Sequence, residues 1–312
     1  MFLLPFQVDF KTHRFPLITI ALIVLCSGIF WLQRASDTRW QNTADFACSH
    51  ADESLRALLS RHAASPVAVQ CRNLVELLAF SGDPERQLPQ LADYFADTPY
   101  AEEIGGRDGV MQLIGQFWAD TQRLGGALPL TSELVYRPRS FNPWRMLTAT
   151  VAHASWGHLL GNLFFFYLFG ATLEAILGHV RYSAFLLALA LGTHSVYSFA
   201  SLGHNAPPTL GLSGVVYGVM GLFAYFLPDA KIRSFVWLLV RFWITPLSAW
   251  FIALWYVGGD ALSLLLNGNG GGVNLVAHVS GAAIALLLGM TIFHKTRDWI
   301  REEAKPYLQR YI

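Results

Sequence analysis

The chain has 312 residues, of which 54% are hydrophobic and only 14% are charged, whereas a soluble domain usually carries about a quarter charged residues. This composition excludes an ordinary soluble protein and predicts an all-α, polytopic membrane protein. A net charge of +1 with no basic cluster excludes nucleic acid as a partner.

The chain begins with residues 1–14, which we expect to be cytoplasmic, followed by an apolar run over residues 15–33. This run, "FPLITIALIVLCSGIFWLQ", is longer than the roughly 7–15 residues of the apolar part of a signal peptide, and no small-x-small cleavage site follows it. A bilayer span needs about 20 mostly apolar residues. We therefore expect a retained first transmembrane helix.

Residues 34–135 are rich in charge and carry more acidic than basic side chains. The stretches "ADESLRALLSRHA", "CRNLVELLAF" and "DGVMQLIGQFWADTQRL" have apolar residues at helical spacing, whereas "SGDPERQLP" and "ADTPY" are typical of turns. A small helical insert outside the membrane is predicted. Outside the cell interior Cys48 and Cys71 could form a disulfide, and the alternative is two buried thiols in a helical core.

Residues 136–293 contain five further apolar segments, and residues 294–312 form an expected cytoplasmic tail. The last but one segment is the least regular, because Arg241 and Pro246 interrupt the apolar run, and its first part, 234–240, is expected at the membrane interface. The five predicted transmembrane helices are 158–177, 182–201, 210–227, 242–262 and 273–293.

Lys and Arg gather in alternate connections, which sets the expected orientation. They occur in 1–14, 178–181, 228–241 and the tail, whereas 202–209 has no charge and 258–272 has only Asp260. Both termini should therefore be cytoplasmic. The second, fourth and sixth helices then all run from the outside to the inside.

Polar side chains occur near the outer ends of these three helices, where each is costly and thus a functional candidate. His158 and Asn162 lie in the second helix, Ser213 in the fourth and His278 in the sixth. At a rise of 1.5 Å per residue, all four lie at a similar depth, roughly 5–10 Å below the outer ends of their helices. Tyr217 is four residues from Ser213 and so shares its face.

Stripes of small residues would let the fourth and sixth helices approach closely. A lone serine among glycines is most often a packing residue, and it is the combination of four polar residues at one depth that favours chemistry. The small residues are Gly214, Gly218 and Gly221 on the fourth helix and Gly281, Ala282, Ala285 and Gly289 on the sixth.

The chemistry that these residues permit is acyl transfer. A serine hydroxyl is a weak nucleophile until a base takes its proton, and His278 could be the base of Ser213. An amide from Asn162, an imidazole N–H from His158 and the Ser213 backbone N–H could stabilise the oxyanion.

A carboxylate that orients His278 is not expected. Glu174 lies near the inner end of the second helix, and Asp260 lies near the outer end of the fifth. We therefore expect a Ser–His dyad, with Tyr217 packing against the imidazole.

At these residues the sequence resembles the rhomboid family of intramembrane serine proteases. "WR" (Trp144, Arg145) precedes "HASWGHLLGN", which resembles the family's HxxxN helix. "GLSGVVYG" resembles the GxSG motif with its downstream tyrosine, and "AHVSG" resembles the AHxxG motif. The likeness covers residues 140–293 and the first helix. Two departures are the long first external loop and Ala285 where many members have a second glycine.

The resemblance implies a six-helix bundle and assigns roles to the motif residues. Substrates would be transmembrane proteins cleaved in or near their helices within the lipid bilayer, without a cofactor or metal, in a bacterial inner membrane with the active site open to the external side. The sequence carries no signal of oligomeric state. Ser213 would be the nucleophile, His278 its base, His158 and Asn162 oxyanion donors, Tyr217 a ring stacked on His278, Gly211 a point of backbone approach to the scissile bond, Gly214 and Gly281 parts of the GxSG and AHxxG motifs, and Trp144 and Arg145 part of the membrane-embedded first loop.

The glycine-rich stretch "LNGNGGGVN", residues 266–274, fits the loop before His278 and could be a mobile cap or a plain connector; no Lys-Ser/Thr follows it, as a phosphate-binding loop requires. A catalytically silent, client-binding rhomboid relative is the main alternative function, although such proteins lose the serine or histidine that this chain retains. The sequence does not support an intramembrane metalloprotease, because it contains no HExxH motif. It does not support a transporter either, because it shows no convincing internal repeat.

Overall fold

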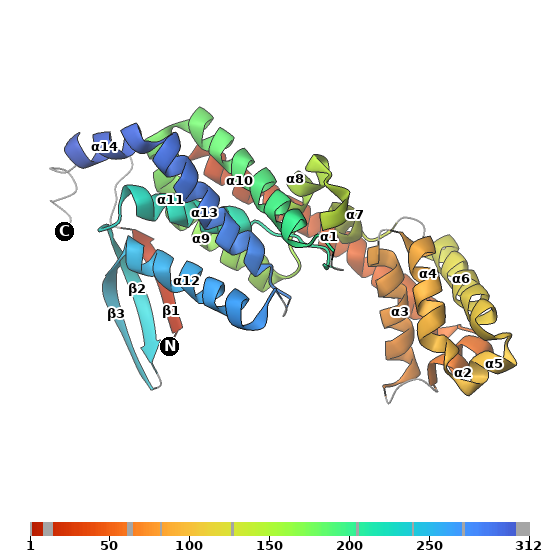
Figure 1. Cartoon of the computed structure of the whole chain (residues 1–312). Helices are drawn as coiled ribbons and strands as arrows, with labels where there is room; N and C mark the ends of the chain where they lie inside the picture. The colour runs from red at the N-terminus through yellow and green to blue at the C-terminus, as the bar shows by residue number, and fades with distance from the viewer. Residues whose placement is uncertain are drawn as a thin grey trace. The chain divides into compact units, whose positions relative to one another are not determined.

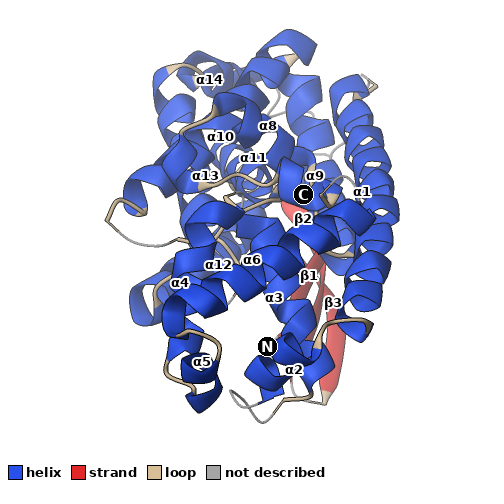
Figure 2. Ribbon diagram, turned by 90° about the vertical axis from the view of Figure 1, so that its right-hand side faces the viewer, coloured by secondary structure: helices blue, strands red, loops and turns tan. Residues whose placement is uncertain are grey.

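The computed structural model describes residues 2–8, 15–60, 65–81, 83–125, 128–203, 206–238, 240–269 and 272–303. These residues form mostly helices, with three strands (Figure 2). The chain divides into two compact units, the first made of Met1–Phe30 and Val135–Ile312 and the second of Trp31–Leu134. The division falls inside the 33-residue helix α1, Leu17–Ser49.

The second unit is a set of helices around its own apolar core, which includes Trp40, Leu78 and Trp118. A disulfide joins Cys48 of α1 to Cys71 of α3, with the two Cα atoms 5.8 Å apart, which is within the usual range for such a bond. The helices that follow α1 here are α2 (Glu53–Ser60), α3 (Val67–Ser81), α4 (Pro84–Ala96), α5 (Pro99–Glu103), α6 (Gly106–Gly125) and α7 (Leu130–Leu134).

The two stretches of the second unit that were predicted as turns contain helix starts. Asp83 caps α4 by accepting a hydrogen bond from the Arg86 backbone N–H, and Thr98 caps α5 in the same way. In each case proline is the first helical residue, a position that tolerates its missing N–H. The sequence signal was therefore a cap followed by proline, and the turn prediction is wrong for residues 84–89 and 99–100.

Most of the apolar helices belong to the first unit, and Figure 1 labels them. Among the described residues, α1, α9, α10 and α12 are long and apolar enough to cross a membrane, and α13 with His294–Ile300 of α14 forms a further candidate bent by 77°. After the short 3-10 helix Pro138–Ser140, the helices are α8 (Pro143–Val151), α9 (Trp156–Leu177), α10 (His179–Ala200), α11 (Ser213–Phe226), α12 (Ala249–Asn267), α13 (Leu275–Thr291) and α14 (His294–Glu303).

Helix α11 is the central helix of this unit. It contacts α9, α10, α12 and α13, and most of its side chains are buried. Its 14 residues give a length of about 21 Å, which is shorter than the roughly 30 Å hydrocarbon core of a bilayer. Helix α11 is therefore too short to cross the hydrocarbon core from end to end.

Helices α11 and α13 meet backbone to backbone. A Cβ atom added to Gly281 would lie 2.1 Å from the carbonyl oxygen of Gly214, and one added to Gly218 would lie 3.0 Å from the carbonyl oxygen of Gly281. Only residues without a Cβ permit this approach. The contact fixes the distance between the N-terminal turns of the two helices.

An antiparallel sheet of order β1–β2–β3 corrects the sequence prediction of a helix from residue 242. Strand β1 (Phe2–Val8) lies in the N-terminal segment, and β2 (Lys231–Leu238) covers much of the stretch assigned to the interface. Strand β3 (Arg241–Ser248) occupies the start of the predicted fifth helix. The prediction of helix from residue 242 is therefore wrong, and α12 begins at Ala249.

Glu174 anchors the start of α1. Its carboxylate accepts hydrogen bonds from the backbone N–H groups of Ile18 and Thr19 at 2.7 and 2.8 Å and from the Thr19 hydroxyl at 2.7 Å. The first N–H groups of a helix have no partner within the helix and carry partial positive charge. This buried carboxylate of α9 therefore has a structural role at a helix N-terminus.

Candidate active site

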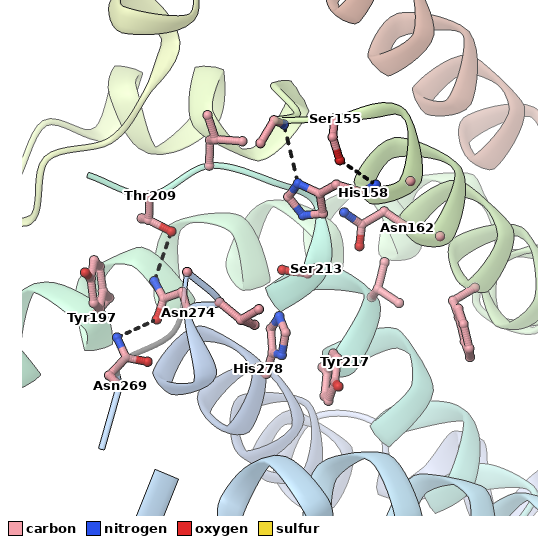
Figure 3. Close-up of a pocket in the computed structure, with 18 of the residues that line it drawn as sticks. Ser155, His158, Asn162, Tyr197, Thr209, Ser213, Tyr217, Asn269, Asn274 and His278 are labelled. Atoms are coloured by element: carbon pink, nitrogen blue, oxygen red, sulfur yellow. Dashed lines mark hydrogen bonds between the residues drawn. The ribbon is translucent and has the colours of Figure 1, made fainter. Parts of the chain in front are cut away.

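A cavity of about 690 Å³ lies in the first unit where the N-terminal ends of α9, α11 and α13 come together. Figure 3 shows the side chains that face it, among them His158, Asn162, Ser213, Tyr217 and His278. Three helices that are far apart in the sequence thus supply the polar groups predicted to act together. Among the described residues, no three His, Cys, Asp or Glu side chains cluster as metal ligands would.

Ser213 is the first residue of α11, so its backbone N–H is one of those that lack a partner within the helix. The preceding turn depends on Gly211, whose φ is +122°, a value that glycine adopts without steric cost. A Cβ at Gly211 would also lie 2.6 Å from Cε1 of His158. The backbone therefore passes directly beside the His158 ring just before Ser213.

His278 lies in the first turn of α13, and its ring stacks on that of Tyr217. The ring centroids are 4.1 Å apart and the planes differ by 14°. Ser213 and His278 face each other across the α11–α13 contact (Figure 3), although no hydrogen bond joins them in the part of the chain that the structure describes. In proteases without substrate this bond is often long and tightens only in the complex.

Asp260 corrects the expectation that no carboxylate orients His278. Its Oδ2 atom is 2.6 Å from Nδ1 of the imidazole. Helix α12 packs against α13 with Asp260 turned toward the histidine. An ionisable residue in an apolar segment was a usable signal, but the sequence does not tell which neighbour it faces.

His158 and Asn162 present hydrogen-bond donors to the cavity. Nδ1 of His158 accepts a hydrogen bond from the Ala154 backbone N–H at 3.4 Å, so in the neutral ring the proton is on Nε2. Asn162 is 7% exposed, and its Nδ2 atom has no hydrogen-bond partner among the described residues. A buried amide without a protein partner is rare, and this one belongs to a residue that lines the cavity, where it is available to a bound group.

His153 lies beside this group, between α8 and α9, with its ring centroid 5.2 Å from that of His158. Burial, and then the nearby His158, lower the pKa of His153 to about 4. His153 is therefore neutral at pH 7. Sequence reasoning did not single it out, although its position five residues before His158 was a visible signal.

Trp144 and Arg145 lie on α8 and do not line the cavity. The Trp144 side chain is 69% exposed. Gly214 and Gly281, by contrast, act through the helix contact described above. The structure thus separates the motif residues into those at the cavity, those that set its dimensions and those away from it.

The loop before α13 forms one wall of the cavity through Asn269, Gly272 and Asn274. Asn274 caps α13 by accepting from the Ala277 backbone N–H and donates to the Thr209 hydroxyl at 3.1 Å (Figure 3). Residues 270 and 271 lie outside the described residues. Asn269, Asn274 and Thr209 were not predicted, because polar residues in a loop carry no distinguishing pattern.

The family model "Rhomboid domain" matches residues 140–295, half of the chain. The Rhomboid protease GlpG of Haemophilus influenzae is 29% identical over 154 residues, covering 49% of this chain and 72% of that protein. Rhomboid protein 1, mitochondrial, of Saccharomyces cerevisiae is 29% identical over 151 residues, covering 47% and 41%. Rhomboid-like protein 11, chloroplastic, of Arabidopsis thaliana is 30% identical over 160 residues, covering 49% and 54%. This chain thus spans about half of the length of the last two relatives.

Proposed function

This chain belongs to the rhomboid family, and on that premise we propose that it is a serine endopeptidase that hydrolyses peptide bonds in or near the transmembrane helices of other membrane proteins. The observation that carries the proposal is that Ser213 and His278 line one cavity beside the α11–α13 contact. The same cavity is lined by Asn162, whose Nδ2 atom has no hydrogen-bond partner in the described part of the chain. Acyl transfer needs a nucleophile, a base and oxyanion donors.

In the proposed reaction His278 takes the proton of the Ser213 hydroxyl as its oxygen attacks the scissile carbonyl carbon. The negative charge that develops on the carbonyl oxygen is stabilised by donors already in place. These are the Ser213 backbone N–H at the positive end of α11, the Asn162 amide and Nε2–H of His158. All three residues line the cavity, and the Asn162 Nδ2 atom has no hydrogen-bond partner among the described residues.

The short length of α11 supports a reaction within the membrane. Because α11 is shorter than a bilayer core, at least one of its ends must lie within the bilayer, and we take this to be the end at Ser213. Water and substrate would reach Ser213 from the side on which α9, α11 and α13 begin.

We further propose that this side faces outward, with both chain termini in the cytoplasm of a bacterium. The distribution of Lys and Arg supports this orientation. So does the disulfide of the second unit, since such bonds persist in oxidising compartments. A reporter fused near residue 80 should be external, and a cytoplasmic signal would overturn the orientation.

A fluorophosphonate probe tests the activity directly, because it reacts with a serine that has an activating base. We expect the wild-type protein in detergent to be labelled and to cleave a model transmembrane substrate, and both properties to be lost in Ser213→Ala and His278→Ala. Ser195→Ala is the matched control, since its hydroxyl bonds to the Leu191 carbonyl on α10 and does not line the cavity.

Cleavage that persists in Ser213→Ala would contradict the mechanism. A wild-type protein that neither labels nor cleaves, yet binds transmembrane clients, would instead support the catalytically silent alternative.

A further inference from the structure

Asp260 is the only acidic or basic residue of α12, and it is placed against the imidazole of His278. Only 9% of the His278 side chain and 24% of the Asp260 side chain are exposed, with Oδ2 and Nδ1 2.6 Å apart. A carboxylate in an apolar helix is costly, and such residues are retained where they have a function. The contact therefore requires an explanation beyond packing.

Glu174, a buried carboxylate on α9, provides a comparison. Glu174 receives three hydrogen bonds from Ile18 and Thr19 at the start of α1, and its side chain also meets His179. Several donors at a helix end indicate a structural anchor. Asp260 caps no helix: its Oδ2 atom lies against the imidazole that faces Ser213, and its carboxylate also interacts with the Tyr217 hydroxyl.

We propose that Asp260 is a positioning residue that holds His278 with Nδ1–H toward the carboxylate and Nε2 toward Ser213. The inference rests on the proposed protease function. An ionised carboxylate can only accept hydrogen bonds, so the proton between Oδ2 and Nδ1 is on the nitrogen. In the neutral ring Nε2 then carries a lone pair, which is the state that a general base requires.

Asp260 contributes at each proton transfer without taking a proton itself. As Ser213 Oγ bonds to the carbonyl carbon, its proton moves to Nε2, and the resulting imidazolium is stabilised by the carboxylate. The same proton then passes to the leaving amine nitrogen as the C–N bond breaks. In the second half a water molecule attacks the acyl carbon and gives one proton to Nε2, which returns it to Ser213 Oγ as the ester bond breaks.

Tyr217 restrains the same ring from its face. Its ring stacks on the imidazole, and its hydroxyl interacts with the Asp260 carboxylate. The charged and titratable groups around His278 are thus Asp260 from α12, Tyr217 from α11 and His158 from α9. Of these, only Asp260 can neutralise an imidazolium.

The test compares Asp260→Asn with wild type in kcat, KM and the pH dependence of kcat for a model transmembrane substrate. An amide can donate to Nδ1, which selects the wrong tautomer. In Ser–His–Asp proteases of another fold the equivalent change lowers kcat on the order of 10⁴-fold. We expect a fall of at least about 10²-fold in kcat with little change in KM, and an acid limb of the pH profile moved to lower pH because the imidazolium has lost its counter-charge.

Two further variants keep the result interpretable. Glu174→Gln should lower the melting temperature and leave the shape of the pH profile unchanged, as a structural carboxylate would. Asp260→Glu keeps the charge but displaces it by one methylene. We expect it to retain the wild-type acid limb with a kcat at least about tenfold lower, and this variant decides the matter if Asp260→Asn does not fold.

The outcomes separate this inference from the proposed function. If cleavage by the wild type does not depend on Ser213, the proposed function fails whatever Asp260 does. If cleavage depends on Ser213 but folded Asp260→Asn, or Asp260→Glu in its place, keeps the wild-type kcat and pH profile, the positioning role alone is overturned.

Discussion

Gly281 is the point at which α13 touches the backbone of α11, and Gly281→Ala tests whether that contact sets the active-site geometry. The added Cβ would lie 2.1 Å from the Gly214 carbonyl oxygen, whereas real Cβ contacts are essentially never shorter than 3.0 Å. The two backbones must therefore separate by about 0.9 Å. A shift of this size between reacting groups costs on the order of 10²-fold in rate, and overpacking costs about 1–3 kcal/mol of stability.

The assay is the rate constant for fluorophosphonate labelling of Ser213 in detergent, measured with the melting temperature of the same sample. Gly28→Ala on α1 is the neutral control, because nothing lies within 4 Å of its added Cβ, and Gly214→Ala is an intermediate case with nearest atoms at 3.2 Å. We expect labelling to slow a few-fold in Gly214→Ala and about 10²-fold in Gly281→Ala. Gly281→Ala with wild-type labelling and melting temperature would refute the reasoning; if that variant does not fold, an unchanged rate in Gly214→Ala does so.

Three other variants test separate features. Asn162→Ala should lower kcat by about 10²–10³-fold, as loss of an oxyanion donor does, without a fall in melting temperature, because its Nδ2 atom has no partner among the described residues; an unchanged kcat would exclude the donor role. Replacing both Cys48 and Cys71 by Ser should cost the second unit about 3 kcal/mol, measured as faster proteolysis of that unit in the full chain, and equal rates would contradict this. The pKa of His153 is about 4 when folded and about 6.5 when unfolded, so the unfolded state takes up a proton first and stability is lost as pH falls from 6.5 to 4. At pH 5 the loss is about 2 kcal/mol, and His153→Gln should melt with a smaller pH dependence than wild type.

Apolar runs were sufficient to locate the helices of the first unit but not the sheet. Residues 234–248 are apolar and contain many aromatic and β-branched residues, a composition that suits strands, and short apolar runs do not distinguish strand from buried helix. Pro246 was the better signal, since proline in a sheet occurs on edge strands and β3 is at the edge. The partner strand β1 could not be inferred, because it pairs with residues more than 200 positions away.

The sequence alone identified those residues of the candidate site whose position follows from the helix period and from their depth in the helix. Ser213 with Tyr217, and His158 with Asn162, each share a face four residues apart, and the structure places all of them at the cavity. Asp260 was discounted because its partner depends on how α12 is rotated about its axis. That rotation is set by packing between helices, which the sequence of α12 alone does not encode.

The contact between Asp260 and His278 joins side chains of two helices, which makes the base sensitive to how those helices are arranged. Helix α12 has few buried residues, so little apolar packing holds it against the bundle. If a client helix pushed α12 outward, the carboxylate would leave the imidazole and the base would lose its tautomer and counter-charge. The proposed base would then have its tautomer and counter-charge only while α12 lies against α13.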